Sequence, residues 1–265
     1  MYSSFKLGKK FAQYYITAAN GKGHGIHSPF VFDFVIHVLN DNKKYPCYNL
    51  IESLRKELLA NDKSIEVEDF GAGSAVIPFK KRKINAIAAS SLKSKKFAQL
   101  LFRIVKYYKP ETIVELGTSF GTTTCYLACA NEQAKVFTLE GSKSIGEIAS
   151  ANFQKFNLPN VYFEQGDFKQ SFPAVLQKIN TVNFLFIDGN HRKEATLFYF
   201  YECLKKSKSS SIFIFDDIHW SKGMEDAWQE IKEHSLVTLT IDLFFIGIVF
   251  FNPDFKVKQD FVIRY

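Results

Sequence analysis

Residues 112–121 read TIVELGTSFG, and this short stretch decides the fold of the chain. The first part, TIVEL, is β-branched and apolar and ends in an acid, which is typical of a buried strand. Gly117 and Gly121 follow it, and the run TTTCYLACA after them favours a helix. Glycines between a strand and a helix let the backbone approach a ligand closely. The stretch therefore predicts a strand, a ligand-binding loop and a helix in succession.

The same alternation continues towards the C-terminus. Short apolar runs bounded by turn residues predict four more buried strands, at 135–140, 160–167, 183–189 and 211–217. Segments of helical length lie around them, at 142–156, 168–178, 192–206 and 223–234. Strands that alternate with helices at this spacing indicate a parallel, doubly wound α/β sheet. Residues 236–251, LVTLTIDLFFIGIVFF, leave almost no room for a helix between two strands, which predicts a hairpin and an antiparallel last strand.

The N-terminal part of the chain is less regular. Residues 94–108 carry an apolar stripe at helical spacing, and Pro110 ends that helix. Before it, Ser28-Pro29 is a helix start followed by an apolar helical run. We therefore expect a basic, mainly helical extension or cap over residues 1–92 and the α/β domain over residues 93–265.

Charge is unevenly distributed along the chain. The net charge is +7, but residues 1–110 carry 19 Lys and Arg against 8 Asp and Glu, and the rest of the chain is acidic. The clusters KKRK at 80–83 and KSKK at 93–96 fit either a footprint for nucleic acid or a solvated lysine-rich face. No aromatic-interleaved RNA motif accompanies the charge, which favours the solvated face.

Cysteines and hydropathy indicate a soluble protein of a reducing compartment. The four cysteines contain no CxxC pair, and Cys125 and Cys129 are best interpreted as small buried apolar residues. The N-terminus lacks the apolar core of a signal peptide, and the most apolar run, residues 243–251, is about half the length of a membrane span. We expect a cytoplasmic protein without a membrane partner.

A second glycine stretch, EDFGAGS at 68–74, looks like another ligand loop. It lacks the helix and the acid-terminated strand that follow the first stretch. Pro78 and KKRK stand where a helix should begin, and no strand ending in an acid comes next. A lone Gly-x-Gly is weak evidence for a site. We interpret Asp69 to Ser74 as a turn or lid element outside the cofactor site.

The ordered motifs resemble those of class I S-adenosylmethionine-dependent methyltransferases. ELGTSFG at 115–121 is similar to their first motif, and Glu140, Gly166-Asp167 and Asp188 follow at the ends of later strands. The resemblance covers roughly residues 94–265 and is greatest to the small-molecule O-methyltransferases, such as the catechol and caffeoyl-coenzyme A enzymes. It implies a Rossmann-like, seven-stranded, doubly wound sheet, mostly parallel with the last strand antiparallel, beside the N-terminal helical extension.

The resemblance also implies where S-adenosylmethionine binds. The methionine part would lie among residues of the first loop, Glu140 would hold the ribose, and Asp167 would lie near the adenine amino group. A carboxylate suits the ribose because it offers two acceptor oxygens to the two hydroxyls. The implied cofactor residues are Glu115, Gly117, Ser119, Gly121, Glu140, Asp167 and Asp188. Glu115 could equally orient the loop without touching the cofactor.

The reacting end is expected after the fourth and fifth strands. By the resemblance, Asp188, Asp216 and Asp217 would hold Mg²⁺ or another divalent cation, which lowers the pKa of a bound hydroxyl. His191 stands where the family has a lysine base, and His219 is a second candidate base. In the metal-free alternative, Asp188 positions substrate or cofactor, while Asp216 or Asp217 caps the next helix.

These features predict an S-adenosylmethionine-dependent methyltransferase that methylates a small-molecule acceptor, with oxygen as the expected target. One alternative keeps the cofactor and uses the basic segment to bind RNA or a protein substrate. Another is a non-catalytic binding module, because a fold alone does not establish activity. The sequence leaves the acceptor and the oligomeric state open.

Overall fold

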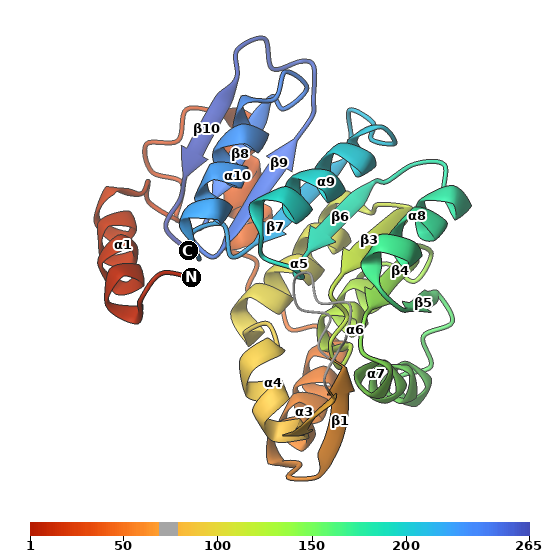
Figure 1. Ribbon diagram of the computed structural model, residues 1–265. Coiled ribbons are helices and arrows are strands. Elements are labelled where there is room, and N and C mark those ends of the chain that lie inside the picture. The colour runs from red at the N-terminus through yellow and green to blue at the C-terminus, as the bar shows by residue number, and fades with distance from the viewer. Residues whose placement is uncertain (69–78) are drawn as a thin grey trace. The chain divides into compact units, whose positions relative to one another are not determined.

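The computed structural model describes residues 1–68 and 79–265, and these fold into two compact units (Figure 1). One unit comprises residues 42–180, and the other comprises residues 1–41 together with 181–265. The predicted turn at Asp69 to Ser74 lies outside the described residues. The functional division into an extension, 1–92, and a domain, 93–265, stays a prediction.

The unit of residues 42–180 contains three parallel strands in the order β3-β4-β5. These are β3 (Thr112–Leu116), β4 (Lys135–Glu140) and β5 (Val161–Gln165). The helices between and after them are α6 (Thr122–Ala130), α7 (Lys143–Lys155) and α8 (Phe168–Lys178). The strand–helix alternation predicted for this part of the chain is confirmed.

Parallel pairing brings the ends of these strands to one edge of the sheet. In the register, Glu115 on β3 lies opposite Thr138 on β4, and Glu140 at the end of β4 lies opposite Gln165 on β5. The middle of β3 and of β4 is fully buried, which explains why both are apolar runs interrupted by few polar residues. The buried polar residues of these strands, Glu115 and Thr138, therefore lie opposite each other near the ends of β3 and β4.

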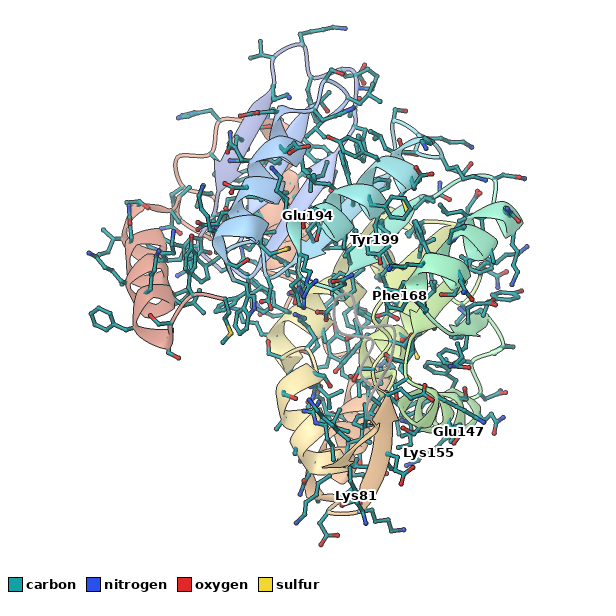
Figure 2. All side chains as sticks on the ribbon, viewed as in Figure 1. Lys81, Glu147, Lys155, Phe168, Glu194 and Tyr199 are labelled. Atoms are coloured by element: carbon teal, nitrogen blue, oxygen red, sulfur yellow. The ribbon has the colours of Figure 1, made fainter. Side chains whose placement is uncertain are left out.

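An N-terminal module precedes the parallel strands in the same unit. It consists of α3 (Pro46–Ala60), an antiparallel hairpin of β1 (Ser64–Glu68) and β2 (Phe79–Lys83), and α4 (Ile84–Ser91). Helix α5 (Lys95–Tyr108) follows it and then leads into β3. An ion pair joins this module to α7: Nζ of Lys155, labelled in Figure 2, lies 2.7 Å from Oε2 of Glu57 on α3.

The basic cluster at 80–83 belongs to strand β2 of this hairpin. Lys81, labelled in Figure 2, pairs in register with Glu66 on β1, and the side chains of 80–83 are exposed. Lysines on an exposed edge strand discourage pairing with another chain, so the cluster has a structural explanation.

The other unit contains five strands in the order β10-β8-β9-β7-β6. They are β6 (Phe184–Ile187), β7 (Ile212–Asp216), β8 (Leu239–Asp242), β9 (Ile246–Phe250) and β10 (Gln259–Val262). Strands β6 and β7 are parallel, whereas β9 is antiparallel to both of its neighbours, β7 and β8. The predicted C-terminal hairpin and its antiparallel strand are therefore confirmed, and β10 is an additional strand, parallel to β8.

Helices of this unit are α1 (Ser4–Thr17), α2 (Pro29–Phe34), α9 (Lys193–Leu204) and α10 (Lys222–Glu233). Helices α9 and α10 lie side by side (Figure 1). Helix α2 begins at Pro29, as the Ser28-Pro29 pair predicts, and continues into a π-helical turn at Val35–Leu39. Across the described ranges, 1–68 and 79–265, no helix is long and apolar enough to cross a membrane.

The two ends of the chain meet in this unit. The Tyr14 hydroxyl on α1 donates a hydrogen bond to the Ile263 carbonyl at 2.5 Å, and Ala19 forms a parallel bridge with Ile263. Tyr14 and Ala18 also pack against Phe244 in a small buried cluster. Helix α1 is thus anchored to the C-terminal strands by both polar and apolar contacts.

Candidate active site

The loop between β3 and α6, residues 117–121, has an unusual backbone. Gly117, Ser119 and Gly121 all have positive φ angles, of 104°, 47° and 80°. A Cβ atom on Gly121 would lie 2.5 Å from the ring of Phe153, so glycine is needed there for space as well as for conformation. The loop therefore turns tightly and aims the N-terminus of α6, as a loop that binds a ligand at a helix start requires.

Glu115 lies beneath this loop and is completely buried. Its Oε2 accepts hydrogen bonds from Thr124 at 2.5 Å and Thr138 at 2.6 Å, and Thr138 also bonds Thr118 of the loop. Its Oε1 has no hydrogen-bond partner. Burial raises the pKa of Glu115 to about 7, although the two threonine hydrogen bonds lower it. These contacts favour the loop-orienting role that the sequence left open.

Glu140, at the end of β4, holds the loop from the other side. Its Oε2 accepts from the Ser119 N–H at 2.8 Å, and its Oε1 accepts from the Ser142 N–H at 3.0 Å. Burial raises the pKa of Glu140, while backbone hydrogen bonds from Ser142 and Ser119 oppose the shift. A carboxylate has about four acceptor positions, so these oxygens can still accept hydrogen bonds from a ligand.

Asp167 caps the next helix in the chain. Its side chain accepts from the Lys169 N–H at 3.0 Å at the start of α8, and it is half-buried. Gly166, directly before it, has a φ angle of 140°, which turns the chain from β5 into that helix. Asp167 therefore lies at the end of β5, and the cap leaves acceptor capacity on its carboxylate.

The predicted reacting residues lie in the other unit, after β6 and β7. Asp188, His191 and Asp216 each offer a ligand atom, and the three atoms lie within 4.8 Å of one another. Asp216 is buried at the end of β7, whereas Asp188 and His191 are half-buried. Ligands on opposite sides of Mg²⁺ are about 4 Å apart, and those of Ca²⁺ about 5 Å, so a small side-chain adjustment suffices for either.

Asp217 and His191 complete this group. Nε2 of His191 lies 3.9 Å from Oδ1 of Asp188 and 3.9 Å from Oδ2 of Asp217. Asp217 has a φ angle of 53°, and its N–H donates to the Phe245 carbonyl at 2.7 Å. Three acidic side chains thus lie around one imidazole, and the cluster of potential metal ligands includes His191 instead of Asp217.

His219, the second candidate base, has both ring nitrogens engaged. Nε2 lies 2.8 Å from Oδ2 of Asp242, and Nδ1 lies 3.2 Å from Oε1 of Glu225, while the ring stacks on Phe244. Lys10 from α1 contacts the same Glu225 oxygen at 2.7 Å. Hydrogen bonds to two carboxylates favour a structural role for His219 in anchoring α1.

Several residues of these sites are absent from the sequence prediction. Thr138 is a polar residue inside the buried run KVFTLE, and this exception to the apolar pattern was the available signal for its bond to Glu115. The hydroxyl of Ser91, at the end of α4, lies 2.8 Å from that of Ser119. No local signal indicates Ser91, because the contact joins residues from separate elements.

A comparison with protein-family models agrees with this geometry. Residues 114–218 match the family model described as a methyltransferase domain, a range that contains the loop of residues 117–121, Glu140, Asp188 and Asp216. A comparison with curated proteins gives no match.

Solved structures of methyltransferases have the same fold. An O-methyltransferase from Bacillus cereus in complex with SAH has a TM-score of 0.56 and 20% identity, over 80% of this chain and 93% of that one. The O-methyltransferase TomG from Streptomyces achromogenes, in complex with SAM, has a TM-score of 0.52 and 17% identity, over 61% and 82%. The SAH-bound Podospora anserina methyltransferase PaMTH1 has a TM-score of 0.58 and 11% identity, over 95% and 97%.

The fold is therefore the Rossmann-like α/β fold of methyltransferases, as the strand pattern predicts. Residues 114–218 match the methyltransferase-domain model, and the resemblance to S-adenosylmethionine-dependent methyltransferases is confirmed.

Proposed function

We propose that this protein transfers the methyl group of S-adenosylmethionine to a hydroxyl oxygen of a small-molecule acceptor. The observation that carries the proposal is the convergence of Asp188, His191 and Asp216 within 4.8 Å. A cluster of this kind can hold a divalent cation, and such a cation makes a hydroxyl acidic enough to act as a nucleophile. The fold alone does not establish this activity, because one fold can carry many functions, so the proposal is based on the chemistry of the site.

The loop of residues 117–121 is the proposed cofactor site. The cofactor has a sulfonium and an ammonium group, and the acids Glu115 and Glu140 lie directly beside this loop. Glu115 keeps one buried oxygen without a hydrogen-bond partner, and Glu140 keeps acceptor capacity for ribose hydroxyls. We propose that Glu140 binds the ribose, that Asp167 lies near the adenine, and that Glu115 supports the loop electrostatically.

The donor set of the other site fits a divalent cation. Two carboxylates and one imidazole suit an ion such as Mn²⁺, which accepts both oxygen and nitrogen ligands, better than the harder Mg²⁺, which prefers oxygen ligands. We propose Asp188, His191 and Asp216 as its ligands. Asp217 lies 3.9 Å from the same His191 nitrogen and adds negative charge to the site.

His191 can also act directly on the acceptor. If its nitrogen does not bind a cation, the neutral imidazole can take the hydroxyl proton, and the adjacent carboxylates stabilise the resulting imidazolium. The two roles differ in their response to a chelator. Turnover that stops on chelation and returns with Mn²⁺, together with a loss of Mn²⁺ affinity in His191→Ala, assigns His191 to the cation. Turnover that survives chelation but is lost in His191→Ala assigns it the base role.

The experiment that tests the reaction is a product assay. The protein is incubated with S-adenosylmethionine and a panel of phenols, catechols and aliphatic alcohols, and S-adenosylhomocysteine formation is followed. We expect turnover with at least one hydroxyl acceptor and its loss in Asp216→Asn. Turnover only on RNA or a protein, or on nitrogen acceptors, would replace the proposed acceptor class.

A further inference from the structure

Helix α4 of the N-terminal module contacts the proposed cofactor loop through a serine pair. The Oγ atoms of Ser91 and Ser119 lie 2.8 Å apart, and Ser91 is the last residue of α4. Ser91 Oγ also donates to the Ile87 carbonyl at 2.8 Å. A serine hydroxyl has a single proton. Because Ser91 donates that proton to the Ile87 carbonyl, its oxygen accepts the hydrogen bond from the Ser119 hydroxyl. The pair therefore has a fixed direction, from Ser119 to Ser91 to Ile87.

This direction determines what Ser119 can offer to a ligand. Its own hydroxyl proton is given to Ser91, which leaves the lone pairs of its oxygen as acceptors only. The half-buried position of Ser119, in the middle of the loop, leaves part of the side chain accessible. An oxygen without an available proton suits a ligand group that only donates, and an ammonium group is such a donor.

The backbone of Ser119 does not depend on Ser91. Its N–H is held by Glu140 at 2.8 Å, and the next residue, Phe120, is fully buried. Phe120 packs among residues of the N-terminal module and α7, namely Leu54, Leu58, Val67, Ile84, Ile87, Ala88 and Ile145. Loss of the Ser91 hydroxyl should therefore free the Ser119 hydroxyl proton to point elsewhere, while the backbone conformation of the loop stays the same.

We propose that Ser91 is a positioning residue that keeps the Ser119 hydroxyl oxygen as an acceptor for the ammonium group of the cofactor. The inference rests on the proposed cofactor role of the loop. It also gives the N-terminal module a part in cofactor binding that its sequence does not indicate.

Two ligands separate this role from a general effect on the loop. S-Adenosylhomocysteine carries the amino-acid ammonium group, whereas 5′-methylthioadenosine shares the nucleoside and lacks it. We expect Ser91→Ala to weaken S-adenosylhomocysteine about threefold to tenfold, the range of one hydrogen bond. The affinity for 5′-methylthioadenosine should stay unchanged, and Ser91→Thr should restore wild-type affinity for both ligands.

Ser90→Ala is the matched control. Ser90 lies beside Ser91 on α4, and its hydroxyl donates to the Ala86 and Ile87 carbonyls of its own helix. Its substitution should leave both affinities unchanged. The Ser91→Ala effect should also vanish in a Ser119→Ala background, since Ser91 is proposed to act only through that hydroxyl.

Calorimetric titration of the full chain decides the matter. Wild-type binding with equal affinities for Ser91→Ala and Ser90→Ala would overturn this inference and leave the proposed function intact. An equal loss for both ligands would also overturn it, because the role would then be structural. If folded wild-type protein binds neither ligand, the proposed function fails and the inference fails with it.

Discussion

Nε2 of His219 lies 2.8 Å from Oδ2 of Asp242, and this contact joins the loop after β7 to the end of β8. Glu225 approaches the other ring nitrogen and also accepts a hydrogen bond from Tyr2 at 2.7 Å. Burial by itself would lower the pKa of His219, but the hydrogen bonds and charges of Asp242 and Glu225 outweigh it and raise that pKa.

A pH-dependent loss of stability should follow from the raised pKa of His219. Its contribution is fully present below the unfolded pKa of about 6.5 and is lost as the pH rises through the higher folded pKa. The difference in unfolding free energy between wild type and His219→Gln should therefore shrink as the pH increases, as urea unfolding between pH 5 and 9 can measure. A difference that stays constant would contradict this. A variant that keeps its stability but loses turnover would assign His219 to catalysis.

Glu115 should give a stability change of the same sign as His219, in a lower pH range. Its folded pKa of about 7 lies above the unfolded value, so the unfolded chain ionises first and stability falls as pH rises between about 4.5 and 7. Glu115→Gln should flatten this fall, which is on the order of 3 kcal/mol for a shift of this size. Unfolding curves of both proteins from pH 4 to 8 check it, and parallel curves would show that Glu115 does not titrate there.

Gly121→Ala should destabilise the protein by about 1–3 kcal/mol, because φ is positive and the new methyl group would meet Phe153. It should also weaken S-adenosylhomocysteine binding. Gly8→Ala is the control, since that glycine lies in helix α1 with nothing within 4 Å of an added Cβ, and alanine should stabilise α1 there. Thermal melts of the two variants should therefore shift in opposite directions, and equal shifts would refute the role given to the loop.

Asp216→Asn should weaken cation binding more than Asp217→Asn does. Asp216 belongs to the group of ligand atoms within 4.8 Å, and Asp217 does not. Mn²⁺ titration followed by calorimetry measures both variants, with Asp188→Asn as the expected equal of Asp216→Asn. Stronger loss in Asp217→Asn would restore the three-carboxylate site that the family resemblance implies.

The sequence predicts the parallel strands well because each is a short apolar run with turn residues at both ends. Helix α8 has the predicted bounds, 168–178. Strand β2 is missed because FKKRK has no apolar alternation, and only its pairing with β1 makes it a strand. Strand β10 is likewise short and half-exposed and depends on its partner β8.

The candidate sites are predictable to the extent that they follow strand ends. Glu115, Glu140 and Asp188 lie at or near the ends of β3, β4 and β6, where parallel pairing places them. The contact of Ser91 with Ser119 and the two partners of His219 come from distant parts of the chain, and such contacts depend on packing that no local pattern records.

The most direct test of the account is calorimetric titration of S-adenosylhomocysteine into the wild-type chain and its Gly117→Val and Glu140→Ala variants. We predict saturable one-site binding with thermal stabilisation for the wild type, none for Gly117→Val, and a large loss of affinity for Glu140→Ala. Folded wild-type protein that shows neither heat of binding nor thermal stabilisation would contradict the assignment of S-adenosylmethionine-dependent methyl transfer.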